Sequence, residues 1–422
     1  MRILMLSQFI YPPTIGGEER HVTDLCVELA ARGHHVSVVA FSHKDFPAFS
    51  IERGVRIHRI HNTMQRMSLL FSENERPYAP PFPDPEALWS LRRIIQEEQP
   101  DIVHAHNWIM HSFTPLKAWS KASCVVSLHD YSLVCVQKRL TYHGENCTGP
   151  GLMKCLECGT KFYGLAKGPL TVLAHRFWQE QERRAVDMFL PVSQAVADGT
   201  QLDKYNVPYK IVPNFIPDRA EVASAEDHPL LAQLPKGDFM LFVGDVTADK
   251  GAEVLLQAYA SLNTEIPLVL IGRPLIPGLV ENPPANVHVM GIWPHDVVMA
   301  VWQRCLFGLV PSTWGEPFCS VALEAMHMGK PVIAARSGGL VDIVSDGETG
   351  ILVPPQDPHA LCNAMQSLLN NPDERASMGK MAKQRVIAFQ ATTVVAHIEH
   401  VYRELQRKKS TGVSSSIRAR GR

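Results

Sequence analysis

Short apolar segments alternate with amphipathic ones along most of the chain. The apolar segments are strand-sized and are bounded by Gly, Pro or charged residues, which predicts strands. The segments between them place apolar residues three and four positions apart, which predicts helices. Near-continuous apolar strands between amphipathic helices are typical of a parallel sheet that helices cover on both faces. The pattern therefore predicts an α/β fold.

The first half of the chain carries one such set of alternations. We predict strands at 3–7, 36–40, 55–60, 102–104, 125–129, 188–192 and 211–213. We predict helices at 18–32, 86–99 and 170–186. Two segments, 64–85 and 141–168, interrupt the pattern and are predicted to be irregular insertions, the second of them rich in Gly and Cys.

The second half repeats the pattern. Strands are expected at 239–243, 268–271, 287–290, 307–311, 332–334 and 351–353, and helices at 251–262, 317–328, 358–369, 372–389 and 392–407. We therefore expect two doubly wound halves of similar size, joined near residue 213. Ligands of such sheets bind at the carboxyl ends of the strands, so we expect a nucleotide-sized ligand in a cleft between the halves.

Composition and charge exclude several classes of protein. Hydrophobic residues make up 45% and charged residues 20% of the 422 residues, which is typical of a folded globular protein. The net charge of −1 argues against a nucleic-acid binder. No apolar run approaches the roughly 18 residues of a membrane span. The N-terminal segment is interpreted as a strand and not as a signal peptide, so we expect a cytoplasmic protein.

The C-terminal end is unusually basic. Residues 407–422 contain six basic side chains and no acidic one, together with several Ser and Gly residues, which predicts a disordered tail. Two interpretations stay open for this tail. It is a solubilising end, or it contacts an anionic membrane surface and holds the protein peripherally at the inner membrane face.

Two loops of the predicted sheets suit a phosphate group. Gly16-Gly17 stands just before a predicted helix, where the backbone can approach a ligand closely and N–H groups favour an anion. In the second half, Gly244 ends a strand and Lys250 begins a helix. The chain contains neither a G-x-G-x-x-G fingerprint nor a G-x-x-x-x-G-K-[ST] loop, which argues against a dinucleotide oxidoreductase and a P-loop NTPase.

The segment from Pro311 to Ala325 combines a buried strand end, a loop and a helix with two carboxylates, Glu316 and Glu324. Eight helical residues span about 12 Å, more than the roughly 5–9.5 Å between paired glycosidase carboxylates. The two carboxylates are therefore predicted to bind two different parts of one long ligand. Backbone N–H groups at the helix start, from Phe318 onward, are predicted to bind hydroxyls or phosphate.

At these residues the chain resembles the family-4 retaining glycosyltransferases of the GT-B fold. The signature motif of that family is matched by Glu316-x7-Glu324. The other matching motifs occur in order over about residues 1–405: Gly16-Gly17, 101–106, His129-Asp130-Tyr131, 191–193, 212–214, Lys250-Gly251, 311–312, 329–332, 338–340 and 346–350. The resemblance implies four segments: an acceptor-binding Rossmann-like domain at 1–212 with a Cys-containing insertion at about 135–168, a nucleotide-sugar-binding one at 213–388, a helix returning to the first domain at 389–406 and the tail at 407–422.

The resemblance also implies the chemistry. The donor would be a UDP- or GDP-linked sugar, with Glu324 on its ribose and Glu316 on its sugar hydroxyls. Lys250, helped by Gly16-Gly17, would neutralise the leaving diphosphate, and His129 would stabilise a cation-like anomeric carbon. Neither a protein nucleophile nor a metal would be needed for catalysis. Further donor-binding residues would be Gly244, Arg273, Pro317, Phe318, Cys319, Ser320 and Val321, and the acceptor side would hold His106, Asp130 and Tyr131.

One position departs from the family pattern. An arginine commonly follows the glycine that ends the first strand of the donor domain, and this chain has Asp245 there. Either Lys250 and Arg273 compensate, or donor binding is weak. Two alternatives to the transferase therefore stay open: a sugar phosphorylase or synthase on the same fold, and a non-catalytic family member.

Four of the nine cysteines crowd into the second insertion: Cys135, Cys147, Cys155 and Cys158. A C-x-x-C end with two further cysteines suits a structural zinc ion, ahead of an iron–sulfur cluster. The alternatives are two disulfides or free thiols. A zinc-dependent regulatory protein is a further class that this cluster leaves open.

The acceptor is not determined by the sequence: a glycan, a lipid-linked molecule and a small molecule all fit. Its determinants are expected in the two insertions. Aromatic side chains that could stack on a sugar are Tyr78, Phe82, Trp89 and Trp108, each of which could equally belong to the core.

Overall fold

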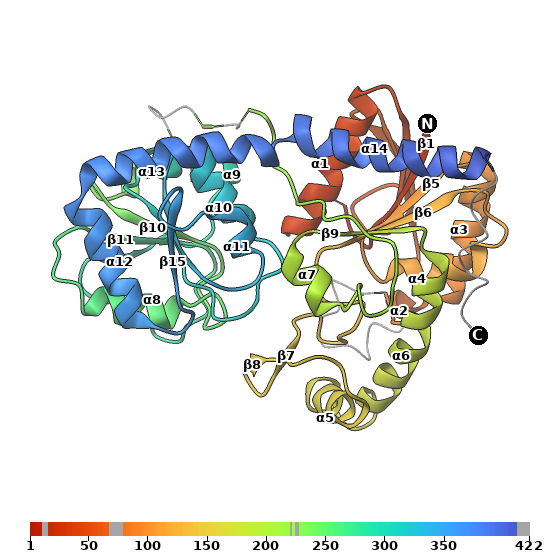
Figure 1. The fold of residues 1–422 in the computed structure, drawn as a ribbon, viewed down its shortest axis with the longest axis horizontal. Helices are drawn as coiled ribbons and strands as arrows, with labels where there is room; N and C mark the ends of the chain where they lie inside the picture. The colour runs from red at the N-terminus through yellow and green to blue at the C-terminus, as the bar shows by residue number, and fades with distance from the viewer. Residues whose placement is uncertain (11–15, 67–78, 220–221, 224–227, 412–422) are drawn as a thin grey trace. The chain divides into compact units, whose positions relative to one another are not determined.

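The computed structural model describes residues 1–10, 16–66, 79–219, 222–223 and 228–411. Tyr78 and most of the basic tail lie outside these residues. The chain divides into two compact units, 1–213 together with the segment from Val394, and 214–393 (Figure 1). Within the described residues, no helix is both long and apolar enough to cross a membrane.

The first unit is built on a seven-stranded sheet in the order β3-β4-β2-β1-β5-β6-β9. All neighbours are parallel except β3, which runs antiparallel to β4. The sequence neighbours β1 and β2 pair on one side, while β5 pairs with β1 on the other, so the winding direction reverses between β1 and β5. The strands are β1 (Arg2–Leu6), β2 (His35–Phe41), β3 (Phe49–Glu52), β4 (Val55–Ile60), β5 (Ile102–Ala105), β6 (Ser123–Leu128) and β9 (Met188–Pro191).

Helices connect these strands. Asp84 caps α3 by accepting hydrogen bonds from the N–H groups of Glu86 and Ala87 at 3.0 Å, and Pro85 stands at its first position, which is how the sequence starts that helix. The helices of this unit are α1 (Gly17–Ala31), α2 (Thr63–Arg66), α3 (Pro85–Glu98), α4 (Ile109–Phe113), α5 (Leu152–Tyr163), α6 (Gly168–Ala185) and α7 (Gln194–Gly199), with the 3-10 turn η2 (Thr114–Leu116).

Several sequence predictions for this unit were wrong, and the short helices α2, α4 and α7 were not predicted. Residues 211–213 form no strand: beside β9 the chain makes an isolated bridge from Tyr209 to Phe189, and the Val212 N–H donates to the carbonyl of Pro191 at 3.0 Å. The edge strand β3 was missed because it has only four residues, although Phe49-Ser50-Ile51-Glu52 alternates apolar and polar residues. The insertion 141–168 is largely ordered: it holds the hairpin of β7 (Thr141–Tyr142) and β8 (Glu145–Asn146), and helix α5. Its Gly and Cys content concealed the helical pattern.

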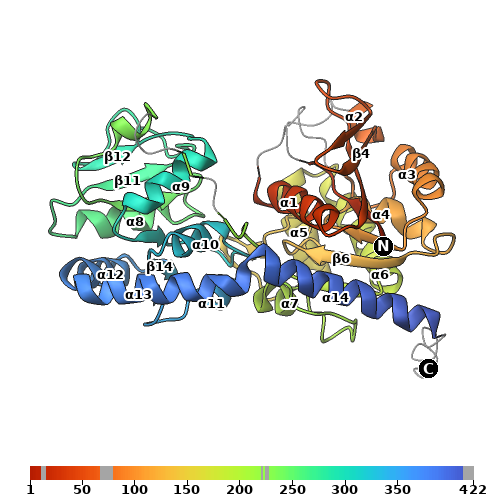
Figure 2. The same ribbon diagram turned by 90° about the horizontal axis from the view of Figure 1, so that it is seen from above.

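The last helix, α14 (Ala391–Ser410), belongs to the first unit from Val394 onward (Figure 2). Tyr402 is fully buried, and its hydroxyl lies 2.6 Å from His104 Nδ1 on β5. Glu399 lies 2.7 Å from His34 Nε2, and Gln406 Nε2 donates to the carbonyl of Asp101 at 2.8 Å. The C-terminal helix therefore completes the core of a unit whose other residues precede 214.

The second unit contains a six-stranded parallel sheet in the order β12-β11-β10-β13-β14-β15. This is the order 3-2-1-4-5-6 of a doubly wound sheet, and its winding reverses between β10 and β13. The strands are β10 (Met240–Val243), β11 (Leu268–Ile271), β12 (Val287–Val289), β13 (Gly308–Val310), β14 (Val332–Ala335) and β15 (Gly350–Val353).

Both faces of this sheet are covered. Leu241 packs into one apolar cluster, while its neighbours Met240 and Phe242 pack into another, as the alternation of side chains along a strand requires. The covering helices are α8 (Ala252–Ala260), α9 (His295–Arg304), α10 (Ser320–His327), α11 (Leu340–Ile343), α12 (Pro358–Asn370) and α13 (Pro372–Arg385), with the 3-10 turns η3 (Leu231–Gln233) and η4 (Val386–Phe389). Helices α9 and α11 were not predicted.

Candidate functional site

The second unit gathers its candidate residues where β10 and β13 lie side by side. The strands pair at Leu241 and Gly308, so the loops after them start at the same sheet edge. These loops contact each other directly: the Thr313 N–H donates to the carbonyl of Asp249, and the Thr313 hydroxyl donates to the carbonyl of Ala248, each at 3.0 Å. The topology thus brings the Lys250 loop against the Glu316 loop.

Lys250 and Glu316 form an ion pair at this edge. Glu316 is only 2% exposed, and the Ser312 hydroxyl donates to the same carboxylate oxygen, Oε1, at 2.8 Å. Burial is the largest single influence on Lys250 and favours its neutral form, but the charge of Glu316, the hydrogen bond to it and further nearby negative groups together outweigh burial and raise the pKa of the ammonium group. The pair is therefore a buried anion and a partly exposed cation whose charges compensate each other.

Two glycines allow the Glu316 loop its path. Gly251, the N-cap of α8, has a φ of +76°, and a Cβ there would lie 1.9 Å from the carbonyl oxygen of Pro311. Gly338 has a φ of +56°, and a Cβ there would lie 2.1 Å from the carbonyl oxygen of Glu316. That same oxygen accepts a hydrogen bond from the Gly339 N–H at 2.7 Å. Any larger residue at either glycine must displace backbone.

Glu324 lies on α10, and its Oε1 is 3.0 Å from Nε2 of His295 at the start of α9. The side chain of Glu324 is 12% exposed and that of His295 is 39% exposed, so this pair reaches solvent. Sequence reasoning missed His295, because its helix was not predicted and nothing local connects it to Glu324.

The helix start at this site differs from the prediction. Helix α10 begins at Ser320 with Cys319 as its N-cap, three residues later than the expected start at Pro317. Pro317 and Phe318 belong to the preceding turn, and the ring of Phe318 packs against Phe389 at 6.3 Å. The first-turn N–H groups are therefore those of Ser320, Val321 and Ala322, of which Ala322 donates to the Cys319 carbonyl.

Asp245 follows Gly244 at the end of β10 and holds Arg273. The guanidinium Nε donates to Oδ1 at 3.0 Å and a terminal NH2 group donates to Oδ2 at 2.6 Å, which is a bidentate pair. This hydrogen bonding raises the pKa of Arg273 further. The cation that was expected to compensate for Asp245 is therefore bound to Asp245 itself.

The first unit places a cluster of four histidines beside its own reversal point: His21, His104, His106 and His129. His106 follows β5 and His129 follows β6. His106 Nδ1 lies 3.0 Å from His129 Nε2, and the two rings stack with centroids 5.3 Å apart. The ring of His21, on α1, is 5.3 Å from that of His129.

Burial keeps much of this cluster neutral. It lowers the pKa of His104 to about 3 and holds the pKa values of His21 and His106 well below the usual range. His104 Nε2 lies 2.8 Å from the Ser127 hydroxyl, opposite its contact with Tyr402. The sequence singled out His106 and His129, whereas the contributions of His21 and His104 depend on strand order.

The remaining predicted residues of this unit lie nearby in the fold. Gly16 is the N-cap of α1 and Gly17 its first residue. Glu18, which was not predicted, accepts a hydrogen bond from Asn107 Nδ2 at 2.8 Å, and burial together with the charge of Asp130 raises its pKa to about 8. Asp130 itself accepts from the Ser132 N–H at 2.7 Å, and Tyr131 is buried.

The aromatic candidates separate into two kinds. Trp108 is buried, and its Nε1 donates to the carbonyl of Ser132 at 3.1 Å, so it is a core residue. Trp89, on α3, is 68% exposed, and Phe82 is half-buried.

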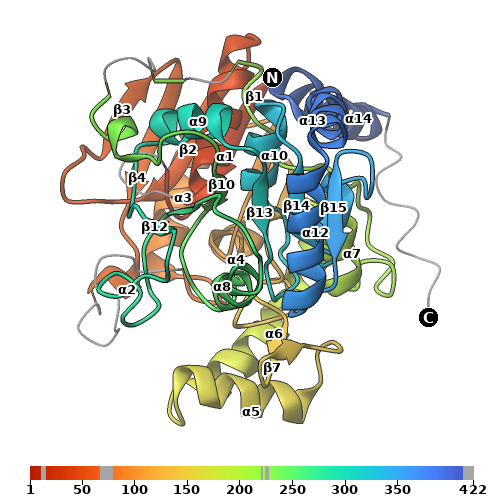
Figure 3. The same ribbon diagram turned by 90° about the vertical axis from the view of Figure 1, so that its left-hand side faces the viewer.

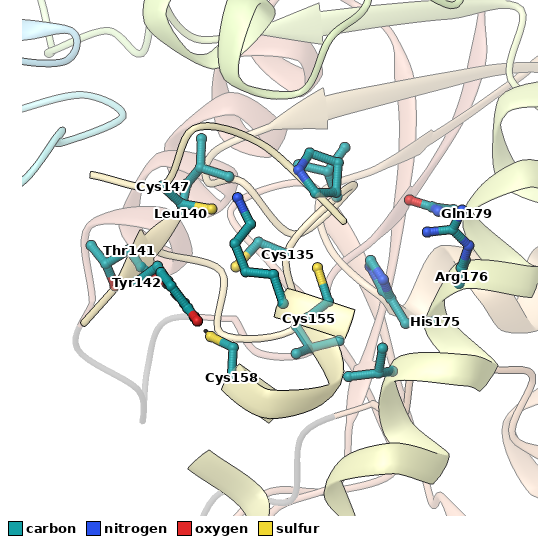
Figure 4. A pocket seen from close by; sticks show the side chains of 15 residues that line it. Cys135, Leu140, Thr141, Tyr142, Cys147, Cys155, Cys158, His175, Arg176 and Gln179 are labelled. Atoms are coloured by element: carbon teal, nitrogen blue, oxygen red, sulfur yellow. Dashed lines mark hydrogen bonds between the residues drawn. The ribbon is translucent and has the colours of Figure 1, made fainter. Parts of the chain in front are cut away.

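The four clustered cysteines do meet in the fold (Figure 4). Cys135, Cys147, Cys155 and Cys158 line one pocket beside α5, together with Val172 and His175 of α6. All are free thiols. Burial, followed by the neighbouring thiols, raises the pKa of Cys158 to about 11, and its Sγ accepts a hydrogen bond from Gln137 Nε2 at 2.9 Å. Across the described part of the chain, no three His, Cys, Asp or Glu side chains are arranged to hold a metal ion. The predicted zinc site is not confirmed.

With this geometry, comparison with known proteins identifies the family. The family described as "Glycosyltransferase Family 4" matches residues 15–219, and "Glycosyl transferases group 1" matches residues 225–385. Together they cover both units, and the chain belongs to the family-4, group 1 glycosyltransferases.

A similar relative is an uncharacterized glycosyltransferase of Methanocaldococcus jannaschii, 33% identical over 171 residues, which are 40% of this chain and 48% of the relative. The chain spans about half or less of the length of this and of other relatives at similar identity.

Solved structures share the fold over nearly the whole chain. Sucrose-phosphate synthase from Thermosynechococcus elongatus superposes with a TM-score of 0.71 at 22% identity, covering 96% of this chain and 98% of that one. HepE of Anabaena, solved in complex with UDP, gives a TM-score of 0.68 at 18% identity, covering 96% and 100%. The predicted GT-B architecture of two Rossmann-like domains is therefore confirmed.

Proposed function

We propose that the protein is a retaining glycosyltransferase that moves a sugar from a nucleotide-diphosphate sugar to a hydroxyl of a glycan, lipid-linked or small-molecule acceptor. The observation that carries the proposal is the Lys250–Glu316 pair, with a buried carboxylate and a partly exposed ammonium group, at the reversal point of the second unit's sheet. Ligands of doubly wound sheets bind at that point, and there a cation and an acceptor of hydroxyl hydrogen bonds stand within reach of one ligand.

Each group of this edge is assigned a part in binding. Lys250 exchanges part of its contact with Glu316 for the donor diphosphate and stabilises the charge that grows as the glycosidic bond breaks. Glu316, held by Ser312, accepts hydrogen bonds from sugar hydroxyls. Glu324 accepts them from the ribose, and His295 orients its carboxylate. The N–H groups of Ser320 and Val321 face the same ligand.

We assign the remaining chemistry to the first unit. His129 stabilises positive charge at the anomeric carbon, and the departing phosphate serves as the base for attack on the same face, so catalysis needs neither a protein nucleophile nor a metal. His106, through its contact with His129 Nε2, fixes the orientation of that ring. Acceptor recognition is assigned to His106, Asp130 and Tyr131.

UDP is the first nucleotide to test, because HepE of Anabaena was solved with UDP. We expect UDP, and not GDP or ADP, to raise the melting temperature of the purified protein, since a ligand at a hundred times its dissociation constant adds about 2.7 kcal/mol. Lys250→Met and Glu324→Gln are expected to abolish the shift. The matched controls are Lys380→Met and Glu374→Gln, at exposed positions on α13.

The Asp245–Arg273 pair favours one alternative, a non-catalytic family member whose phosphate site has lost one of its cations. Release of UDP from UDP-sugar in the presence of acceptor would exclude it. If no nucleotide shifts the melting temperature of the wild-type protein, the transferase proposal fails and this alternative replaces it.

The cysteine cluster is given no part in this reaction. A structural zinc ion there predicts about one zinc per purified chain and its loss in Cys155→Ser, whereas free thiols predict four alkylated cysteines and no zinc. Metal analysis and mass spectrometry of the alkylated protein separate the two interpretations.

A further inference from the structure

Exposed apolar side chains concentrate on the α5–α6 hairpin. Seven of the nineteen large hydrophobic residues exposed in the described structure lie within 26 consecutive residues, and their exposed fractions range from 44% to 85%. We call these seven residues the hairpin surface: Leu152, Met153, Phe162, Leu165, Leu170, Leu173 and Phe177. Large apolar side chains that gather at the surface of one element in this way indicate an interaction site.

The two helices of the hairpin are packed tightly against each other, which turns these side chains outward. A Cβ on Gly168 would lie 2.5 Å from Thr160 Cα, and one on Gly159 would lie 2.5 Å from Val172 Cγ2, so α5 and α6 approach as closely as two glycines permit. On α6, Val172 and His175 are buried, and His175 Nε2 lies 2.7 Å from the Ser132 carbonyl.

The opposite face of α6 carries Leu170, Leu173 and Phe177 at spacings of three and four, which places them on one stripe. These residues are 68%, 53% and 59% exposed. In Figures 1 and 3, α5 and the start of α6 project from the first unit away from its sheet. The hairpin surface is thus the outer end of its unit.

The charges of the same segment are strongly biased. Between residues 152 and 177 the cationic side chains are Lys154, Lys161, Lys167 and Arg176, and the one acid is Glu157. The Glu157 carboxylate accepts a hydrogen bond from the Tyr142 hydroxyl at 2.8 Å and lies 3.0 Å from His143 Nε2. An apolar surface interspersed with cations is complementary to an anionic partner.

We propose that the hairpin surface inserts into the interface of an anionic membrane. Outward-facing Leu and Phe side chains flanked by Lys and Arg are the composition of elements that lie in the headgroup region. A lipid surface is favoured over a protein partner because the apolar residues project from the end of a helical hairpin and are flanked by cations, a charge pattern that is complementary to anionic headgroups. The inference does not depend on the proposed transferase activity.

The test is co-sedimentation of the full chain with vesicles of phosphatidylglycerol or phosphatidylcholine. We expect binding to phosphatidylglycerol, and a loss of about tenfold or more in the partition coefficient of Leu170→Ser/Leu173→Ser/Phe177→Ser. Because all three positions are exposed, circular dichroism and melting temperature should match the wild type. Leu275→Ser/Val280→Ser/Ile292→Ser, at exposed positions of the second unit, is the matched control and should bind as the wild type does.

Two results would overturn the proposal. The first is that the α6 variant binds vesicles as well as the wild type does. In that case, loss of vesicle binding by a chain that ends at residue 411 would show that the basic tail binds the membrane. The second is that the wild type binds neither kind of vesicle but is dimeric at micromolar concentration, while the α6 variant is monomeric. The hairpin surface would then be an interface between two copies of the chain.

Discussion

At the scale of single residues, the site is defined by charges that the fold removes from water or sets against one another. Lys250 and Glu316 compensate each other at the sheet edge, and Asp245 binds the guanidinium of Arg273. The first pair leaves a cation beside the proposed diphosphate position. The Asp245–Arg273 pair keeps the guanidinium group of Arg273 from binding the diphosphate.

Asp245→Asn should therefore strengthen nucleotide binding. Removing the carboxylate takes a negative charge away from the proposed diphosphate and frees Arg273, which we expect to lower the dissociation constant for UDP about two- to tenfold, given an interaction of about 1 kcal/mol in a solvent-exposed pair. Isothermal titration calorimetry at low salt measures this. Asp373→Asn, at the exposed start of α13, is the control. Weaker binding by the Asp245 variant would show that the Asp245–Arg273 pair itself orders the loop.

Glu182 predicts a pH dependence of stability. It lies 3.3 Å from His111 Nε2 in the core of the first unit; burial raises the pKa of Glu182 to about 8 and lowers that of His111 to about 3, so both groups are neutral in the folded protein. Between about pH 4.5 and 8 the folded state holds a proton on Glu182 that the unfolded state has lost. Stability from this group therefore falls as pH rises through that window.

Glu182→Gln, which cannot ionise, should become more stable than the wild type as pH rises from 5 to 8.5, by roughly 1–3 kcal/mol at the upper end. Thermal unfolding at several pH values measures the difference. Glu180→Gln, a more exposed carboxylate on the same helix, should give a difference that does not change with pH. A constant difference for Glu182→Gln as well would mean that Glu182 ionises normally.

At the scale of elements, backbone contacts decide where the Glu316 loop lies. Gly338 precedes α11, and Glu316 follows β13, yet the two backbones nearly touch. No helix or strand pattern in the sequence predicts that contact. The glycine pair Gly338-Gly339 is the one local feature of the sequence that is associated with it.

Gly338→Ala should displace Glu316 and weaken donor binding. At a φ of +56° with backbone 2.1 Å from the new Cβ, we expect a loss of about 2 kcal/mol or more of stability. Gly347 is the matched control, because its φ of +76° imposes similar strain while nothing lies within 4 Å of its Cβ. Gly347→Ala should therefore cost only about 1 kcal/mol and leave UDP binding intact. Equal effects of the two substitutions on UDP binding would contradict the role given to the close contact.

At the scale of the whole molecule, the chain leaves its first unit at residue 213 and contributes to it again from Val394. The core of that unit is therefore incomplete until the last helix has been made. The buried His104–Tyr402 contact joins residues on β5 and α14.

Tyr402→Ala should destabilise the first unit by about 3–5 kcal/mol, because it opens a cavity in the core and leaves His104 Nδ1 without its partner. Chemical denaturation followed by hydrogen exchange measures this unit separately from the second, whose amides should keep their protection. His400→Ala, an exposed position on the same helix, should change little. Equal loss of protection in both units would show that they unfold as one.

The sequence by itself determined the alternation of strands and helices, the two Rossmann-like halves and the positions of Gly16, Lys250, His129, Glu316 and Glu324. These features are local, because each depends on a short stretch of sequence: the period of the hydrophobic residues, the glycines, and the residues that start a helix. Errors fell where the local signal was short or mixed: at the four-residue strand β3, in the Cys-rich insertion with α5, and at the start of α10.

Only the tertiary structure decided which of these residues meet. The partners of Glu324, Arg273, His129 and His104 lie on other elements, and their contacts follow from strand order, which single-sequence periodicity does not encode. The same holds for the hairpin surface: its leucines and phenylalanines have the pattern of core residues, and only the packing of α6 through its opposite face leaves them exposed.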